Sequence, residues 1–178
     1  ATVQGCDRAT RLVEQLLQLA RLDAEPATGN AQSTPLADVI RSVVAECSPT
    51  AQRRQQELAI TEPLPAALHI PLPEPLARVL LRNLLDNALR YSPNGAQVRL
   101  QVAQAQGFTE LTVEDSGPGL APEQLARLGE RFFRVLGTGQ TGSGLGWSIV
   151  QRIARIHRLQ INTDTSPELG GLRVKVRW

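Results

Sequence analysis

A stretch of helical character with two different sides lies near the middle of the chain, from Pro73 or Glu74 to Tyr91. At 3.6 residues per turn, Asn83, Asn87 and Arg90 share one side, at positions i, i+4 and i+7. The apolar residues on the opposite side are Ala77, Leu81, Leu84, Leu85 and Ala88. We therefore expect the apolar side to pack on a core and the other side to present two amides and a cation in a row.

Amide and guanidinium groups in such a row suit a site for a phosphate compound and its metal. Amide oxygens ligate hard cations, and arginine binds phosphate. A solvated helix face explains the same residues equally well, so the rest of the chain has to decide between the two interpretations.

Composition restricts the class of protein. The chain has 178 residues, of which 42% are hydrophobic and 20% charged, enough for one globular domain plus an appendage. A net charge of +2 is too small to indicate binding to nucleic acid or to a membrane surface.

Cys6 and Cys47 are far apart and form no C-x-x-C pair, so we interpret them as free thiols of a reducing compartment. No apolar run approaches the length of a membrane span, and no secretory leader is evident.

The N-terminal part, residues 1–24, has one helical pattern, with Leu12, Leu16 and Leu19 in a stripe. An isolated helix of this length is marginal in water. We expect it to pack against helices of a second copy or of a missing segment; a core helix of the main domain is the alternative. A linker rich in Pro, Gly and small polar residues occupies 25–34, and the main domain occupies 35–178. The abrupt start inside a helical pattern suggests a fragment of a longer protein.

The main domain mixes helices with hairpin-connected strands. Strands are predicted at 58–60, 68–70, 97–103, 108–114, 159–163 and 172–177, and helices from Pro35, at 74–91, at 122–128 and at about 144–157. This order predicts an α/β two-layer sandwich, with a mixed, mostly antiparallel sheet and helices on one face, preceded by the N-terminal helix.

Two glycine-containing segments stand where ligands commonly bind. Asp115-Ser116-Gly117-Pro118-Gly119 follows a strand; its carboxylate can accept a hydrogen bond from an exocyclic amine, although a type II turn explains the glycines equally well. Gly142-Ser143-Gly144-Leu145-Gly146 opens a helix, whose N–H groups and dipole favour phosphate; a glycine-rich surface loop is the alternative. The residues between Phe133 and Gly142 could form a lid.

Together these segments resemble the ATP-binding domain of bacterial sensor histidine kinases, in the GHKL superfamily with gyrase, Hsp90 and MutL. Asn83/Asn87, Asp115-x-Gly-x-Gly, Arg131-Phe132-Phe133-Arg134 and Gly142-Ser143-Gly144-Leu145-Gly146 are similar to that family's N, G1, F and G2 boxes. The resemblance covers about residues 35–177, implies the GHKL (Bergerat) fold, and is greatest to the QseC and PmrB type of membrane sensor. Residues 7–23 resemble the second helix of the dimerisation and histidine-phosphotransfer hairpin.

The resemblance implies roles at the phosphates of Mg-ATP. Asn87 would ligate Mg²⁺, and Asn83 would contact the phosphates or a metal-bound water. Arg90 would face phosphate, and Arg131 or Arg134 would reach the γ-phosphate. The residues that would hold the phosphates at the helix start are Gly142, Ser143, Gly144, Leu145 and Gly146.

At the other end of the nucleotide, the resemblance implies a pocket for the base. Asp115 would accept a hydrogen bond from the adenine amine, and Gly117, Gly119 and Leu120 would shape the pocket, with Tyr91 flanking the nucleotide. The chain departs from the family at three places, where Trp147, Arg158 and Leu172 replace an aliphatic residue, a Gly and a Thr.

The implied reaction is transfer of the γ-phosphate to a histidine, for relay to an aspartate of a response regulator. The superfamily's ATPases have a glutamate base where this chain has Asn83, and an amide cannot accept that proton, so we expect a kinase. An ATP-gated binding module without turnover, or a GHKL ATPase, are the alternatives. Neither His69 nor His157 has the context of the family's acceptor histidine. The acceptor motif of the family is therefore missing from this chain. The resemblance implies that the chain is a cytoplasmic portion of a longer, dimeric protein of the bacterial inner membrane.

Overall fold

The structure is a computed structural model that describes residues 33–64, 67–105, 107–128, 130 and 145–178. The N-terminal helix predicted at 7–23 lies outside these residues. None of the helices in the described ranges has the length and apolar character needed to cross a membrane.

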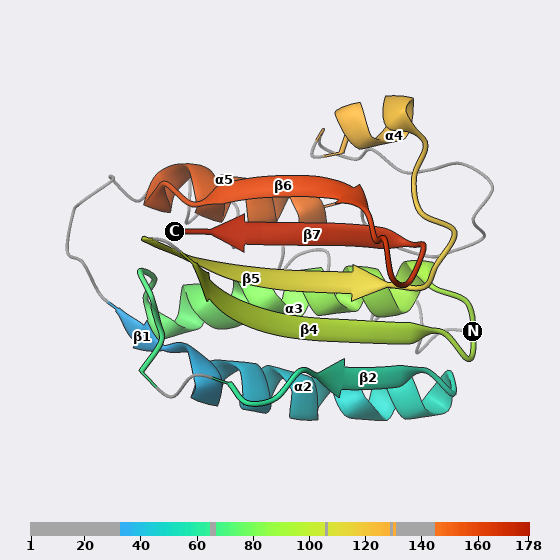
Figure 1. The fold of residues 1–178 in the computed structure, drawn as a ribbon, viewed down its shortest axis with the longest axis horizontal. Coiled ribbons are helices and arrows are strands. Elements are labelled where there is room, and N and C mark those ends of the chain that lie inside the picture. Colours follow the sequence, from blue (N-terminus) through green and yellow to red (C-terminus); the bar gives the residue numbers. More distant parts are fainter. Residues whose placement is uncertain (1–32, 65–66, 106, 129, 131–144) are drawn as a thin grey trace, which may run out of the picture.

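A five-stranded sheet forms one layer of the molecule, in the order β2-β4-β5-β7-β6 (Figure 1). The strands are β2 (Glu57–Ile60), β4 (Gln97–Ala105), β5 (Phe108–Asp115), β6 (Gln160–Thr165) and β7 (Leu172–Arg177). β2 pairs with β4 in parallel, and the other three pairs are antiparallel. The mixed, mostly antiparallel sheet predicted from the sequence is therefore confirmed.

Helices form the second layer, on one face of the sheet (Figure 1). They are α2 (Leu36–Arg53), α3 (Glu74–Tyr91) and α5 (Gly146–His157), with α3 packed between the other two. The short α4 (Pro122–Ala126) stands apart from this layer in Figure 1. It ends two residues before the predicted Leu128, because Arg127 already has the geometry of a helix C-cap.

A small second sheet, which the sequence pattern did not predict, closes the start of the domain. β1 (Thr34–Pro35) pairs antiparallel with β3 (His69–Ile70). The Thr34 hydroxyl donates to the carbonyl oxygen of Leu72 at 2.7 Å. These contacts join the residues before α2 to those before α3.

The core lies between the two layers, and α2 and α3 each contribute seven buried residues to it. All five apolar residues predicted to share one side of α3 are buried, so that prediction is confirmed. The sheet residues that face them are Val98, Leu100, Leu111, Val113, Val174 and Val176. Burying one such side chain is worth about 2 kcal/mol, which fixes the helix on the sheet and so fixes which side of it faces outward. Cys47 on α2 is a buried free thiol, and burial raises its pKa to about 11.

The other face of the sheet is covered by the charged side chains of its own strands. Asp164 on β6 accepts two hydrogen bonds from Arg173 on β7, both at 2.7 Å. Glu110 on β5 pairs with Arg177 on β7. These groups neutralise one another, and most of them remain half exposed. The pairs therefore make the face polar without adding much stability.

Candidate functional site

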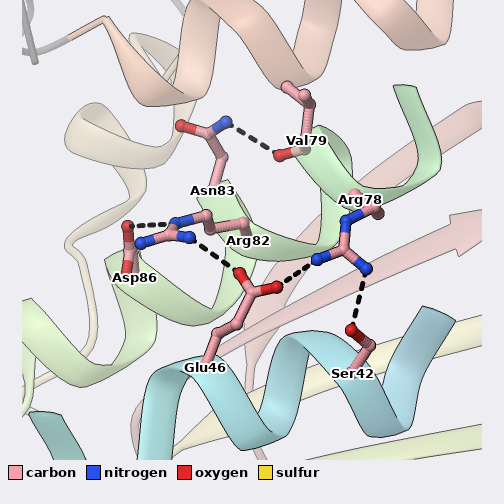
Figure 2. A network of polar contacts seen from close by, with 7 residues as sticks. All are labelled: Ser42, Glu46, Arg78, Val79, Arg82, Asn83 and Asp86. Atoms are coloured by element: carbon pink, nitrogen blue, oxygen red, sulfur yellow. Dashed lines mark hydrogen bonds and ion pairs between the residues drawn. The ribbon is translucent and has the colours of Figure 1, made fainter. Parts of the chain in front are cut away.

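The side-chain oxygens of Asn83 and Asn87 converge on the first residue of α5. A Cβ on Gly146 would lie 2.9 Å from Asn83 Oδ1 and 3.5 Å from Asn87 Oδ1. Asn83 Nδ2 donates to the carbonyl oxygen of Val79 at 2.8 Å, which leaves Oδ1 on the side away from Val79 (Figure 2). The absence of a side chain at Gly146 is what lets α5 start so close to the two amides.

This junction combines groups that attract opposite charges. The first N–H groups of a helix have no acceptor within the helix, and its dipole makes that end positive. Leu145, at the N-cap of α5, has no side-chain oxygen to satisfy them. Amide oxygens, in contrast, are acceptors that suit a hard cation. The arrangement therefore fits an anion and its metal counterion together, as in a metal–phosphate complex.

Arg90 and Tyr91 occupy the last turn of α3, on the same helix as the two asparagines, and both are half buried. Trp147 follows Gly146 and belongs to the buried core, 9% exposed, so the indole fills core space.

The C-terminal end of α3 is held by two residues from the segment between α2 and β2, which sequence analysis missed. Arg54 Nη2 donates to the carbonyl oxygen of Ser92 at 2.8 Å, and Nη1 donates to that of Arg90 at 3.1 Å. Gln56 Nε2 donates to the carbonyl oxygens of Leu89 at 2.9 Å and Ser92 at 3.1 Å. These bonds satisfy carbonyls that a helix end otherwise leaves without partners. They also place Ser92 beside the next part of the site.

Asp115 is the last residue of β5 and is only 6% exposed. Its Oδ1 accepts hydrogen bonds from the N–H groups of Gly117 at 2.8 Å and Leu172 at 3.3 Å. Burial raises the pKa of the carboxyl, and these two N–H groups act in the opposite direction. Neither of the two amides uses Oδ2, so the carboxylate keeps an oxygen with which to accept a hydrogen bond from a ligand.

A buried hydroxyl lies next to this carboxylate. Ser92 is fully buried, and its Oγ has no partner of full hydrogen-bond geometry among the described residues. The hydroxyl is nevertheless close enough to Asp115 to lower the pKa of that carboxyl. A Cβ on Gly117 would lie 3.2 Å from Ser92 Oγ and 2.8 Å from Asp115 Oδ1. The weakly paired hydroxyl fits a site that is completed by a polar ligand or an ordered water.

Glycine is needed at positions 117 and 119, after Asp115, for two different structural reasons. Gly117 has no room for a Cβ beside the Asp115 carboxylate, and Gly119 has a φ of +67°, which favours glycine. Leu120, next in the chain, is half buried. Arg131, Arg134, Gly142, Ser143 and Gly144, also predicted as site residues, lie outside the described residues.

Comparisons with known proteins agree with this geometry. Residues 73–178 match the family of histidine kinase-, DNA gyrase B- and HSP90-like ATPases. The chain belongs to this family. The resemblance and the fold class predicted from the sequence are therefore confirmed.

The sensor protein QseC of Escherichia coli K12 is 45% identical to the chain over 174 residues, which are 98% of the chain and 37% of QseC. The chain thus spans little more than a third of that relative. The structure of the cytoplasmic segment of histidine kinase QseC has a TM-score of 0.64 and 33% identity, over 97% of this chain and 93% of that one. Full-length ShkA in complex with AMPPNP has a TM-score of 0.78 and 27% identity, over 98% of this chain and 36% of that one.

Proposed function

We propose that this chain is the ATP-binding catalytic part of a two-component sensor histidine kinase. It would transfer the γ-phosphate of Mg-ATP to a histidine on a phosphotransfer helix, and a response regulator would receive the phosphate from there. The observation that supports this most directly is the convergence of the Asn83 and Asn87 oxygens on Gly146 at the start of α5. The relatives named as histidine kinases, one of them in complex with AMPPNP, support the same function.

The phosphates would lie at the junction of α3 and α5. Mg²⁺, when bound, would neutralise part of the charge of the phosphates. Asn87 would supply an oxygen ligand to the metal, and Asn83 would orient the phosphates or a metal-bound water. Arg90 would add a positive charge, and the N–H groups after Leu145 and Gly146 would bind phosphate oxygens. Positioning and charge neutralisation would thus provide most of the catalysis.

Residues outside the described ranges keep the roles that the resemblance implies. Arg131 or Arg134 would reach the γ-phosphate, and Gly142, Ser143 and Gly144 would hold phosphates together with Gly146.

The base would bind at the end of β5. Asp115 would accept a hydrogen bond from the exocyclic amine of adenine, and the Ser92 hydroxyl would bind a water that bridges to the base. Gly117, Gly119 and Leu120 would form the wall of this pocket, while Tyr91 would flank the nucleotide. A buried carboxylate of this kind rejects a base that lacks the amine, because the acceptor would then be left unpaired.

Asn83 favours a kinase over an ATPase. Its Nδ2 already donates to Val79, and neither end of a neutral amide can accept a proton from an attacking water. In the intact protein, a homodimer anchored in the membrane would bring the acceptor histidine to the γ-phosphate.

The test is binding of a non-hydrolysable ATP analogue with and without Mg²⁺, for the chain and for two variants. Asn87→Ala should lose about tenfold or more of the Mg-dependent affinity, since a metal ligand is worth more than 1.4 kcal/mol. Asn162→Ala, an exposed asparagine on β6, is the matched control and should bind as the original chain does. Equal, metal-independent binding by all three would contradict the metal assignment.

A second assay separates the kinase from its alternatives. The chain is mixed with γ-labelled ATP and a separately supplied hairpin that carries an acceptor histidine, and label on the hairpin is measured. No transfer despite proven ATP binding would contradict a kinase and favour a binding module. Steady phosphate release that Asn87→Ala abolishes would instead identify an ATPase.

A further inference from the structure

Two adjacent residues of β5, Glu114 and Asp115, both bond to the same turn. The turn, residues 166–171, joins β6 to β7. The Asp115 carbonyl oxygen, which points along the plane of the sheet, accepts a hydrogen bond from Gly171 N at 3.0 Å. The Glu114 side chain lies on the face of the sheet opposite to the Asp115 side chain, and its Oε2 accepts a hydrogen bond from Ser166 Oγ at 2.6 Å. The turn is therefore held both through the backbone of β5 and through one of its side chains.

Ser166 connects Glu114 to the backbone of the whole turn. Its N–H donates to the carbonyl oxygen of Gly171 at 2.8 Å, and its own carbonyl accepts from Gly170 N at 2.9 Å. Its hydroxyl accepts from Leu169 N at 3.0 Å while donating to Glu114. A hydroxyl that is both donor and acceptor has a fixed orientation, and the turn is fixed with it.

Glu114 is suited to anchor this turn because its side chain is buried, only 5% exposed. Its Oε1 lies 3.5 Å from Arg99 Nη1, and Arg99 also pairs with Glu168 of the same turn. A buried carboxylate is tolerated only where it is paired and hydrogen bonded, and a hydrogen bond to a charged group is stronger than a neutral one. The bond from Ser166 is therefore strong, and the Glu114 side chain that accepts it lies on the face of the sheet opposite to the Asp115 side chain.

The turn is in tight contact with the base-recognition residue. A Cβ on Gly171 would lie 2.3 Å from both the carbonyl oxygen and Oδ1 of Asp115. Leu172, directly after the turn, donates its N–H to the same Oδ1. A shift of the turn therefore moves an amide that orients the Asp115 carboxylate.

We propose that Glu114 and Ser166 are positioning residues that set the chain's preference for a purine with an exocyclic amino group. They fix the turn at 166–171, the turn places Leu172 N–H on Asp115 Oδ1, and Asp115 then presents its carboxylate to the amine. The inference rests on the proposed ATP binding, and neither residue touches the nucleotide. The inference predicts that changing Glu114 or Ser166 weakens recognition of the exocyclic amino group and leaves binding of the rest of the nucleotide unchanged.

The experiment compares binding of Mg-ATP with binding of magnesium purine riboside 5′-triphosphate, which lacks the amine. Ser166→Ala should weaken ATP binding about tenfold, equivalent to one lost hydrogen bond, and leave binding of the purine analogue within about twofold. Glu114→Gln exchanges a charged acceptor for a neutral one, so it should weaken ATP binding in the same selective way but by less than Ser166→Ala. Ser166→Thr keeps the hydroxyl and should retain the preference for ATP. Glu110→Gln is the matched control, because Glu110 lies on the same strand and face, paired with Arg177.

Thermal unfolding of each variant distinguishes positioning from general damage to the fold. Equal weakening of both nucleotides, or an unchanged preference for ATP in folded Glu114→Gln and Ser166→Ala, would overturn the inference and leave the proposed function intact. Should Glu114→Gln fail to fold, Ser166→Ala decides the question alone, because it removes the donor of the bond and introduces no new polar group. If the original chain binds neither nucleotide, the proposed function fails and the inference with it.

Discussion

The side-chain oxygen of Asn83 and the α-carbon of Gly146 are so close that a methyl group on Gly146 would be only 2.9 Å from that oxygen. The contact joins the middle of α3 to the first residue of α5. The close contact with Asn83, and not helix formation, is therefore the reason for a glycine at this position, because alanine favours a helix by about 1 kcal/mol over glycine.

Gly146→Ala should therefore reduce nucleotide affinity while changing the stability of the fold only slightly. The new methyl group pushes the end of a flexible side chain, which can move away, but Asn83 then leaves its place and its bond to Val79. We expect Mg-ATP affinity to fall about tenfold or more, and urea unfolding to shift by less than about 1 kcal/mol. In an Asn83→Ala background the clash is absent, so the same Gly146→Ala change should increase stability. A large loss of stability in that background would show that the clash lies elsewhere.

Gly171→Ala should be much more damaging than Gly170→Ala next to it. A Cβ on Gly171 would meet backbone and carboxylate atoms of Asp115 at 2.3 Å, and backbone cannot move aside. Gly170 has a φ of +82° but open space around it, so only backbone strain of about 1 kcal/mol is expected there. Gly171→Ala should cost at least about 3 kcal/mol and abolish ATP binding. Chemical denaturation and nucleotide titration measure both, and similar effects at the two positions would contradict the tight contact.

ATP binding should weaken in mild acid because of Asp115. Its pKa is raised above the ordinary 3.8, mainly by burial, so the carboxyl takes up a proton at a higher pH than usual. Affinity should rise as the pH rises through that raised pKa, because only the ionised form accepts freely from the adenine amine. The free energy of unfolding of the nucleotide-free chain should change in the opposite sense. The stability that the protonated Asp115 contributes is fully present below pH 3.8, the ordinary pKa of the group in the unfolded chain. It is lost as the pH rises through the raised pKa of the folded chain.

Two measurements isolate this carboxyl. The affinity of purine riboside 5′-triphosphate should lack the acid step, because that ligand offers no amine to Asp115. In Asp115→Asn the step in stability should disappear, while ATP binding becomes weak at every pH. Persistence of the stability step in that variant would assign it to another group.

Arg54→Ala should destabilise the fold by about 2 kcal/mol, although the side chain is only partly buried. The variant leaves carbonyls at the end of α3 without their charged donor, and it removes a positive charge from the negative end of the helix dipole. Arg53→Ala is the matched control, since Arg53 is exposed and bonds, among the described residues, to Thr50 of its own helix. That change should stay within about 0.5 kcal/mol in urea unfolding. Equal effects of the two variants would contradict the capping role of Arg54.

Arg158→Gly should stabilise the chain by about 0.5–1 kcal/mol. Arg158 ends α5 in the left-handed region, with a φ of 58°, where a side chain is strained and glycine is not. Arg155→Gly, an exposed position inside the same helix, should instead lose about 1 kcal/mol. A loss of stability with Arg158→Gly would show that its side chain makes a compensating contact.

Much of the fold follows from local patterns in the sequence. The 3.6-residue period of α3 predicts which side is buried, and alternation predicts both hairpins to within two residues at their ends. Asp115 could be named as a candidate because an acidic residue followed by two glycines ends an alternating strand. These features depend on neighbours in the sequence, so the sequence alone carries them.

The supporting contacts of the site could not be predicted in the same way. Ser166 and Glu114 are 52 positions apart, and Arg54 is 38 positions from Ser92. Each of these residues, considered locally, is an ordinary polar residue of a loop or strand. The parallel pairing of β2 with β4 is similarly invisible to periodicity, because alternation shows that a strand exists and says nothing about its neighbours.

The order of the strands has a consequence for how the protein is made. β5 occupies the centre of the sheet, but its partner β7 is the last strand along the chain. During synthesis, the amide of Leu172 reaches Asp115 only after nearly the whole domain has left the ribosome. The nascent chain can therefore assemble α2, α3 and the β4–β5 hairpin early, yet the proposed base site around Asp115 is complete only once β7 has been translated.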